Sequence, residues 1–595
     1  MSSRWHTSIS APDRAWLSFV GAWGLLTLLP FLPSLATPHP RSPYFPLCVE
    51  VLVLGTAVVY AHHTRWARAT RIGAGLGVGV LLLYEAYDAT VYVATRRSGI
   101  LYEDLQYVDN LGYLLLNLWS WRMGALALLA LAGALGAARL VAWGLRTVAR
   151  TGRYGGCRAA LLAVHLGAWP LIVVVGPALE LGPVNMTYQS SSERARVRTA
   201  TTRAVANVQA SLRLQTMLDS LQTAPVDSTY AGYDSLSLDR RPSIYLLMVE
   251  SYGSALNTHP SLRAPYRALL RRTDSLLAAD GWHRATARSD VPVRGGRSWL
   301  SIASFLTGTR VGHQLLFNQF QAAADDESNR KAPHLVHFLD DQGYRTVALQ
   351  PFVFERPGLP VRNLYDFDVP LYRDDLNYEG PSYGLADAPD QYSLHYAHET
   401  QLRATDEPFV LFFETVDSHS LWNYGLPPYL DDWRQFNQQT EPPRSPPSNT
   451  ASVPPVFLPD SLTTPLIYDQ PTPLRYLRHV AHELRVLREY LVENAPPGSL
   501  VLLLGDHQPP LIDSADRTVP LHVLSTDSTL VARAREQGFT DGLRPSPTGR
   551  TLRQEGLYSF LVRLLVAHDR GTAPTDTTGL PALQPRGLPP SLLMQ

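Results

Sequence analysis

The sequence contains very little cysteine and lysine. Its 595 residues include two cysteines, Cys48 and Cys157, and one lysine, Lys331. Both cysteines lie in or beside apolar segments, so a disulfide framework and a cysteine-rich metal site are excluded. The formal net charge is zero, so a nucleic-acid partner has no electrostatic support. No internal repeat is present, and the chain is too long for one ordinary domain.

Long apolar stretches are confined to the first third of the chain. Each is about as long as the roughly 20 residues that a helix needs to cross a bilayer. They cover about residues 15–36, 44–63, 72–95, 121–145 and 158–179. We therefore predict a transmembrane domain of five helices over residues 1–183. The first stretch also fits a cleaved signal peptide with a weak cleavage site at 34–36, which would leave four spans.

Arginines between the predicted spans indicate their orientation. The loop after the second span and the loop after the fourth are rich in arginine, whereas the other two loops have few arginines or offset them with acids. By the positive-inside rule the N-terminus is cytoplasmic, and everything after the last span lies outside the cytoplasm. The signal-peptide alternative keeps that location. Residues 101–119 fit either an interfacial helix on the outer face or a connecting loop.

The rest of the chain has the pattern of a soluble α/β domain. We predict a helical linker over residues 184–240, a catalytic domain over 241–570 and a flexible tail over 571–595. Within the domain, apolar runs alternate with amphipathic helices, which indicates a mostly parallel sheet between helices. The runs are residues 243–249, 345–349, 409–413 and 499–504, and the helices are 261–278, 332–342 and 473–494. Residues 423–470 are rich in Pro, Asn, Gln and Ser and are interpreted as a surface insertion.

Polar residues follow two of these apolar runs. Glu250 ends the first run, and Asp506 and His507 follow the last one. Ligands of open α/β sheets bind at the carboxyl ends of the strands, so two carboxylates and an imidazole at such ends suit one divalent cation. Ser298 follows two glycines between these runs, and beside a cation its hydroxyl would be an activated nucleophile. Each residue also has an ordinary structural explanation, such as a turn for Asp506 or a helix N-cap for Ser298.

Several motifs together resemble a known superfamily. Residues 298–308 fit the spacing of the sulfatase signature, Cys/Ser-x-Pro-Ser followed by five residues and Thr-Gly. Residues 249–251 and 505–507 resemble the two metal-ligand segments of lipoteichoic acid synthases, 414–419 their strand-end histidine motif and 383–387 their Trp-Gly-Leu-x-Asp stretch. With the predicted spans, the chain resembles the lipoteichoic acid synthase-like branch of the alkaline phosphatase superfamily.

The resemblance implies a fold and a set of site residues. The catalytic domain is expected to have the alkaline phosphatase/sulfatase fold, with Ser298 as nucleophile. One divalent cation is expected to be coordinated by Glu250, Ser298, Asp506 and His507. Mn is the preferred ion, and Mg or Zn are the alternatives. His419 and Arg356 are expected to contact the substrate, although a surface histidine and a solvated arginine are the simple alternatives.

The chain departs from the pattern of the family in two ways. The nucleophile of this branch is usually Thr, whereas this chain has Ser298. Sulfatases convert their Cys or Ser to formylglycine, which needs Pro and Arg where this chain has Leu300 and Ile302. These departures favour direct phosphoryl chemistry by an unmodified serine.

The resemblance implies a membrane-anchored transferase with an extracytoplasmic catalytic domain. It would move a phospholipid headgroup of the phosphoglycerol or phosphoethanolamine type to a glycan or lipid acceptor through a phosphoseryl intermediate. Its partners would be the lipid bilayer, a phospholipid donor and a glycan or glycolipid acceptor, without nucleic acid, at the inner cell membrane. A sulfatase-type or phosphodiester hydrolase of the same fold is the alternative, and a non-enzymatic membrane protein with a degenerate fold is a third.

Overall fold

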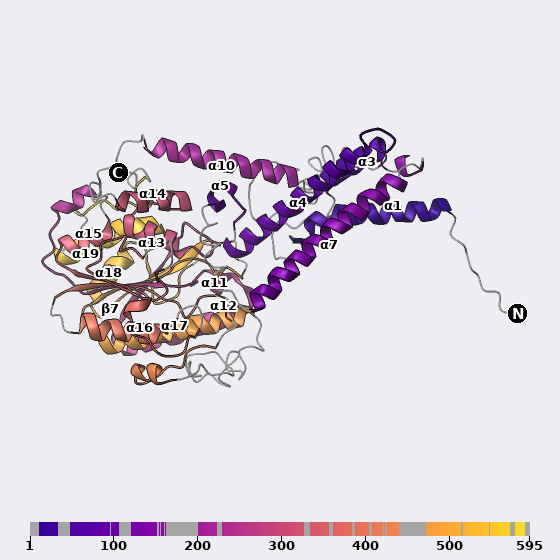
Figure 1. Cartoon of the computed structure of the whole chain (residues 1–595). Helices are drawn as coiled ribbons and strands as arrows, with labels where there is room; N and C mark the ends of the chain where they lie inside the picture. The colour runs from indigo at the N-terminus through magenta and orange to yellow at the C-terminus, as the bar shows by residue number, and fades with distance from the viewer. Residues whose placement is uncertain are drawn as a thin grey trace. The chain divides into compact units, whose positions relative to one another are not determined.

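The computed structural model describes most of the chain as two compact units, Met1–Met217 and Leu218–Gln595 (Figure 1). The described residues are 11–33, 48–95, 97–105, 121–151, 154, 156–159, 161, 163, 200–222, 229–325, 334–355, 361–383, 387–403, 407–420, 422, 425–439, 472–512, 514, 516–546, 548–571 and 578–589.

The first unit is built from helices. They are α1 (Ala11–Leu28), α3 (Val49–Ala61), α4 (Ala67–Thr95), α5 (Leu101–Asp104), α7 (Trp121–Thr151) and the first part of α10 (Ala200–Gln222). Helices α1, α3, α4 and α7 pack on one another around buried apolar side chains such as Phe19, Leu26, Val78 and Val141. Leu83 and Leu128 remain exposed on the outside, as expected of helices that meet lipid.

Two of the predicted spans are helices long and apolar enough to cross a membrane, Ala67–Val93 and Leu128–Thr151. The first two predicted spans are shorter apolar helices, Ala15–Phe31 and Glu50–Ala61. The α-helical part of the first ends at Leu28, where Pro30 opens a 3₁₀ turn, because proline cannot supply a backbone donor inside a helix. The fifth predicted span, 158–179, lies almost entirely outside the described residues. The five-helix domain therefore stays a prediction.

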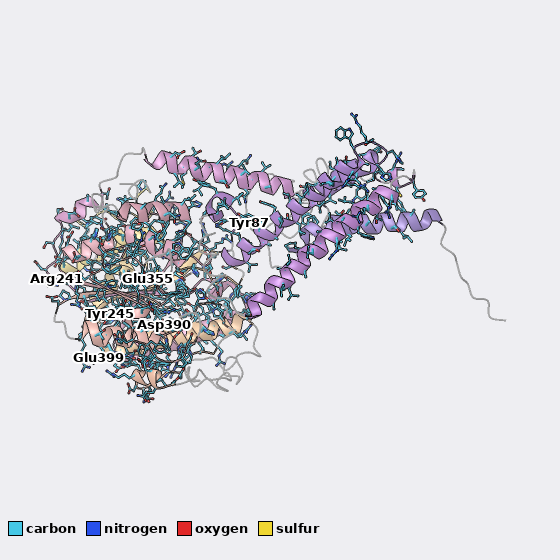
Figure 2. All side chains as sticks on the ribbon, viewed as in Figure 1. Tyr87, Arg241, Tyr245, Glu355, Asp390 and Glu399 are labelled. Carbon is cyan, nitrogen blue, oxygen red and sulfur yellow. The ribbon has the colours of Figure 1, made fainter. Side chains whose placement is uncertain are left out.

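A helix of the predicted linker is attached within this unit. The side chain of Asn207 on α10 accepts a hydrogen bond from the N–H of Leu101 at 2.8 Å and donates one to the carbonyl of Gly99 at 2.8 Å. Nearby, the hydroxyl of Tyr87, labelled in Figure 2, donates to Asp104 at 2.5 Å. Helix α5 covers the start of the segment 101–119, and residues 106–120 lie outside the described ranges.

The second unit is built on one mixed sheet. Its strands are β1 (Ile244–Val249), β2 (His283–Asp290), β3 (Arg345–Gln350), β4 (Val369–Tyr372), β5 (Phe409–Glu414), β6 (Leu500–Gly505), β7 (Thr518–Ser525), β8 (Thr540–Asp541) and β9 (Thr551–Arg553). They lie in the order β4-β3-β5-β1-β6-β7-β2-β8, with β9 also on β2. The first five strands in this order, β4, β3, β5, β1 and β6, are parallel to one another. Strand β7 is antiparallel to both of its neighbours, β6 and β2.

The four predicted apolar runs form β1, β3, β5 and β6, four of the five strands of the parallel half. All six residues of β1 are buried, as expected of a central strand that is covered on both faces. The sheet is mostly parallel, as expected, but the pairings of β7 with β6 and β2 and of β8 with β2 are antiparallel, so it is a mixed sheet. Strand β2 is rich in polar and charged residues and β7 contains Pro520, so neither reads as a buried run.

Helices cover both faces of the sheet (Figure 1). On one face lie α12 (Pro260–Ala279), α16 (Asp390–Ala397) and α17 (Thr472–Asn494), and on the other α13 (Ser298–Thr307), α15 (Leu335–Asp341), α18 (Ser528–Glu536) and α19 (Leu557–Asp569). The predicted helices 261–278, 332–342 and 473–494 correspond to α12, α15 and α17. An apolar core joins β1 to α12, α16 and α17, through side chains such as Tyr245, Leu247, Tyr266 and Tyr490.

Two predicted irregular segments are described in part. In the predicted insertion, residues 425–439 include a short 3₁₀ helix in which Phe436 is buried, and 440–471 lie outside the described ranges. In the predicted tail, residues 578–589 lie against the domain: the N–H of Leu588 donates to the carbonyl of Gly308 at 2.9 Å. Arg563 on α19 donates to the carbonyl of Pro581 at 2.7 Å.

Candidate metal centre

Three neighbouring parallel strands end at the candidate site. Glu250 follows β1, and Asp506 and His507 follow β6, which pairs directly with β1. The segment 415–419 follows β5, which pairs with β1 on its other side. Since parallel strands all end at the same edge of a sheet, this order brings residues far apart in sequence to one place.

Ser298 lies at the centre of this group. Its Oγ is 2.8 Å from Oδ2 of Asp506, 3.3 Å from Oε2 of Glu250 and 3.3 Å from Nε2 of His507. His507 Nε2 is in turn 3.1 Å from Asp506 and 3.8 Å from Glu250. A hydroxyl has one proton to donate and here faces three acceptors. The structure thus brings together four of the residues predicted from the sequence.

The backbone before Ser298 explains how it reaches the site. Gly296 and Arg297 have positive φ angles of 61° and 64°, and Ser298 is the first residue of α13. The left-handed conformation is favourable for glycine but costs free energy at Arg297. The turn aims the N-terminus of a ten-residue helix at the two carboxylates. Ser301, one turn later, fixes the helix by donating to the carbonyl of Asp506 at 2.8 Å.

Ser251 holds both carboxylates in position. Its φ angle is 56°, a left-handed conformation that is unusual for a residue other than glycine. In this conformation its N–H donates to Oδ1 of Asp506 at 2.7 Å, and its hydroxyl donates to Oε1 of Glu250 at 2.6 Å. The other carboxylate oxygens are the ones that face Ser298.

His507 is oriented as a metal ligand. Its Nδ1 lies 3.0 Å from the carbonyl oxygen of Gln508, and because a carbonyl can only accept, Nδ1 carries the proton. Nε2 then presents its lone pair to Ser298 and the carboxylates. A backbone carbonyl behind the imidazole is the usual partner of a metal-bound histidine.

The charges of the site also fit a cation. Burial and the neighbouring Glu250 raise the pKa of Asp506 well above its usual value. Burial acts to raise the pKa of Glu250 as well, but its electrostatic interactions with His507 and His419 and its hydrogen bonds outweigh burial, so that its pKa is lowered. Burial lowers the pKa of His507, which favours the neutral imidazole. Two close, buried carboxylates need a proton or a cation between them, and this donor set suits a divalent cation such as Mn or Zn.

His419 lies beside this group, and Arg356 lies outside the described residues. The segment 415–419 carries His419, whose Nδ1 donates to the carbonyl of Ser420 at 2.5 Å. The ring stacks on Phe352 with centroids 6.2 Å apart. His419 lies close enough to this group to affect the pKa values of Glu250 and His507.

Three residues that support the site were not singled out from the sequence. Ser251 is the first, and Thr415 and Ser418 are the others: the N–H of Glu250 donates to Thr415 Oγ1 at 3.1 Å, and Ser418 donates to the carbonyl of Glu250 at 2.7 Å. In the sequence, the feature that points to these three residues is their position directly after predicted strands. Small hydroxyl residues are common in turns, so that signal alone does not separate support of a site from turn formation.

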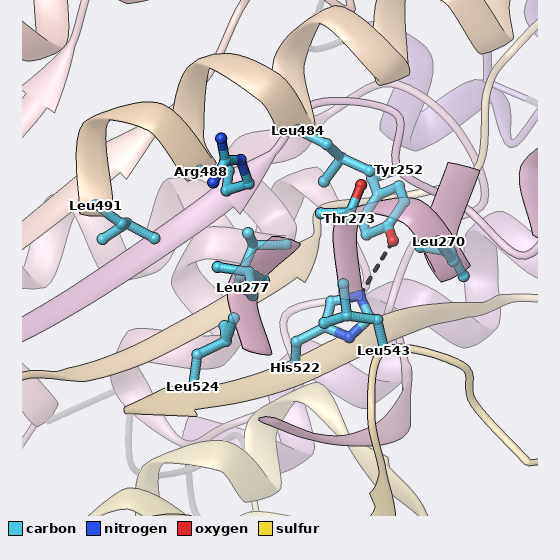
Figure 3. A pocket seen from close by; sticks show the side chains of 11 residues that line it. Tyr252, Leu270, Thr273, Leu277, Leu484, Arg488, Leu491, His522, Leu524 and Leu543 are labelled. Carbon is cyan, nitrogen blue, oxygen red and sulfur yellow. Dashed lines mark hydrogen bonds between the residues drawn. The ribbon is translucent and has the colours of Figure 1, made fainter. Parts of the chain in front are cut away.

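A separate pocket lies between α12, α17 and the strands β6 and β7 (Figure 3). Most of the side chains that line this pocket are leucines, and Glu250, Ser298, Asp506 and His507 are not among them. His522 in the pocket bonds Tyr252 at 3.0 Å and Thr286 at 2.7 Å, so both ring nitrogens are satisfied. Burial lowers its pKa to about 3. This histidine is a neutral core residue.

No family model and no curated protein matches the sequence. Several solved structures are similar to this chain. The integral membrane lipooligosaccharide phosphoethanolamine transferase A of Neisseria meningitidis is 13% identical with a TM-score of 0.45, covering 93% of this chain and 95% of that one. The lipoteichoic acid synthase LtaP of Listeria monocytogenes is 14% identical with a TM-score of 0.35, covering 61% and 80%. A protein of Vibrio parahaemolyticus is 13% identical with a TM-score of 0.34, covering 62% and 76%. That protein is described as a member of the alkaline phosphatase superfamily, and the likeness of this chain to all three is one of fold.

Proposed function

We propose that this protein is a membrane-anchored, metal-dependent transferase. It would move a phospholipid headgroup with its phosphate, of the phosphoglycerol or phosphoethanolamine type, to an extracytoplasmic glycan or lipid acceptor. The observation that carries the proposal is the position of the Ser298 hydroxyl. It lies at the N-terminus of α13 within 2.8–3.3 Å of Asp506, Glu250 and His507.

The residues have separate tasks in this proposal. Glu250, Ser298, Asp506 and His507 would hold one divalent cation, which lowers the pKa of a bound hydroxyl and offsets phosphate charge. Ser251 keeps the two carboxylates turned toward Ser298. The N–H groups of Ser298 and Trp299 at the start of α13 would offer hydrogen bonds to a phosphate bound in front of Ser298.

The reaction would proceed in two displacements at phosphorus. In the first, Ser298 Oγ would pass its proton to Oδ2 of Asp506, 2.8 Å away, and form a bond to phosphorus, while the bond from phosphorus to the diacylglycerol oxygen breaks. His419 would give that oxygen a proton. In the second, an acceptor hydroxyl would pass its proton to His419 and form the new bond to phosphorus, while the bond from phosphorus to Ser298 Oγ breaks and Oγ takes its proton back from Asp506. The headgroup and its phosphate pass intact from lipid to acceptor.

The residues after Ser298 support phosphoryl transfer over sulfate-ester hydrolysis. Leu300 and Ile302 stand at the positions where formylglycine formation needs Pro and Arg, and both side chains are buried in the core under α13. Ser298 would therefore remain an ordinary serine. Transfer to an alcohol and hydrolysis by water differ only in what enters the second step.

A membrane anchor is consistent with a lipid as the donor. Helices α4 and α7 contain the two candidate spans. We propose that further spans complete a multi-pass anchor in the inner cell membrane, and that the second unit lies outside the cytoplasm. A tethered site of this kind meets phospholipids of the outer leaflet without having to extract them from the bilayer.

Product identification tests the proposal. Purified full-length protein in detergent would be incubated with Mn²⁺ and labelled phosphatidylglycerol or phosphatidylethanolamine, and products would be identified by mass spectrometry. Diacylglycerol release by the wild type, lost in Ser298→Ala, is the expected result. Ser304→Ala is the matched control, because this hydroxyl on the same helix bonds only backbone groups of Leu300 and Val311. Release of free glycerol phosphate or ethanolamine phosphate whatever acceptor is added would instead identify a hydrolase.

A further inference from the structure

A second group of acidic residues lies behind the segment 415–419. Asp390 opens α16, Asp417 follows β5, and Glu483 lies in the middle of α17. Asp390 is labelled in Figure 2. One oxygen of each carboxylate lies within 4.8 Å of the others, and the three residues are 0%, 8% and 0% exposed. Nothing in the proposed transfer reaction uses them.

Hydrogen bonds account for only part of this group. Oδ2 of Asp390 accepts from the N–H groups of Val416 and Asp417 at 2.6 Å each, and Oδ2 of Asp417 accepts from the N–H of Asp390 at 3.1 Å. By contrast, no N–H or alcohol group in the described residues donates to Oδ1 of Asp390 or to either carboxylate oxygen of Glu483. The carboxyl groups of Asp390 and Glu483 lie close enough to bond each other, which requires that one of them keeps a proton. A fully buried carboxylate without a donor is costly, and a cation can take the place of that shared proton.

No strong base neutralises the three carboxylates. Among the described residues, the one ion pair they make is between Asp417 and His482, whose Nε2 is 3.5 Å from Oδ2. His482 is itself fully buried. Burial raises the pKa of Asp417 to about 7 and, with the charge of Asp417, that of Asp390 to about 8. Burial and the other two acids hold the pKa of Glu483 well above its usual value. The group thus needs protons or a cation to become neutral.

We propose that Asp390, Asp417 and Glu483 form a second divalent-cation site, separate from the one around Ser298. Separations of no more than 4.8 Å between the ligand atoms suit one shared ion, since ligands on opposite sides of a cation lie about twice 2.0–2.6 Å apart. Three carboxylates form a donor set for a divalent cation such as Mn²⁺. Binding of the ion displaces the protons that the raised pKa values retain.

The second cation would fix the segment that carries His419. Asp417 belongs to this segment, and Asp390 accepts hydrogen bonds from its backbone. On its other side the same segment bonds the backbone of Glu250 through Thr415 and Ser418. The cation would therefore join α16, α17 and the end of β5 directly behind the first site.

Counting bound metal tests this proposal independently of any activity. Full-length protein in detergent would be stripped with a chelator, reloaded with Mn²⁺ or Zn²⁺, freed of excess ion by gel filtration and measured by inductively coupled plasma mass spectrometry. We expect about two ions per chain in the wild type and about one in Asp506→Ala, which removes a ligand of the first site only. Glu483→Gln should also retain about one ion, because the amide keeps the shape and removes the charge.

Glu414→Gln is the matched control. Glu414 is another acid at the end of β5, its carboxylate bonds Gln350 at 3.0 Å, and burial raises its pKa to about 7. This variant should keep both ions. One ion in the wild type and none in Asp506→Ala would overturn the second site, and so would two ions in Glu483→Gln. If Glu483→Gln fails to fold, the metal content of Asp506→Ala still tests the proposal. One bound ion in that variant supports the second site, and none excludes it.

Discussion

Oγ of Ser298 donates a hydrogen bond of 2.8 Å to Oδ2 of Asp506, although 208 residues separate the two in sequence. The contact exists because β1 and β6 are neighbours and α13 begins just above their ends. The other oxygen of Asp506 is held by the N–H of Ser251 at 2.7 Å. The same oxygen also accepts from the N–H of His507 at 2.6 Å, while Oδ2 is left to face Ser298 and the imidazole of His507, where it can also bind a cation.

Ser251→Ala should weaken binding of the active-site cation about 10- to 100-fold, the usual effect of losing a partner behind a metal ligand. The variant removes the 2.6 Å hydrogen bond that turns Glu250 but keeps the N–H that holds Asp506. Titration of stripped protein with Mn²⁺, followed by electron paramagnetic resonance, measures the change.

Ser251→Gly separates this effect from backbone strain. Glycine adopts the φ angle of 56° freely, so this variant should lose affinity as Ser251→Ala does and yet unfold at a higher denaturant concentration than Ser251→Ala. Unchanged Mn²⁺ affinity in both variants would show that Ser251 does not position Glu250.

His419→Ala should lower kcat for diacylglycerol release about 10²- to 10⁴-fold while the content of bound metal stays the same. The reason is that His419 belongs to the segment beside the site and is not one of its proposed metal ligands. His337→Ala is the control, since that ring pairs with the exposed carboxylate of Asp366 at 3.3 Å. A loss of metal in His419→Ala would make this residue a ligand, and an unchanged kcat would exclude it from the reaction.

Metal-free protein should lose stability as the pH rises from about 5 to about 8. Burial raises the pKa of Asp417 to about 7 and that of Asp390 to about 8, whereas in the unfolded chain both titrate near 4. The folded state therefore binds more protons in this range, and its stability falls as these protons are lost. Thermal unfolding midpoints in the presence of a chelator at pH 5.5 and pH 8 measure the effect.

Asp390→Asn should flatten this pH dependence, because it removes one of the titrating groups. Glu379→Gln, a change at an exposed carboxyl, should leave the dependence as it is in the wild type. A midpoint that rises between pH 5.5 and pH 8 in metal-free wild type would contradict the assignment of these acids as protonated when no cation is bound.

The second unit should be accessible from outside the cytoplasm. Protease added to spheroplasts is expected to cleave within residues 190–595, since the positive-inside rule predicts a cytoplasmic N-terminus from the arginine-rich loops and five spans then put these residues outside. Cleavage of this region only in inverted vesicles would reverse the topology.

The parallel half of the sheet and the site at its edge were predictable from sequence. Strands β1 and β6 are uninterrupted apolar runs, and Glu250, Asp506 and His507 directly follow them. Burial on both faces leaves this signature. The antiparallel half was missed because β2 alternates small and polar residues, some of which are buried. The cluster of Asp390, Asp417 and Glu483 was missed because no periodicity links an acid on α16 to one on α17.

The most direct test of the central claim is the mass of the peptide that contains Ser298. Full-length protein with Mn²⁺ would be mixed with phosphatidylglycerol or phosphatidylethanolamine in the absence of acceptor, quenched in acid and digested. The account predicts Ser298 carrying the phosphate and headgroup of the donor, and plain serine when no donor is added. Formylglycine at position 298, or consumption of the donor by Ser298→Ala at the rate of the wild type, would contradict it.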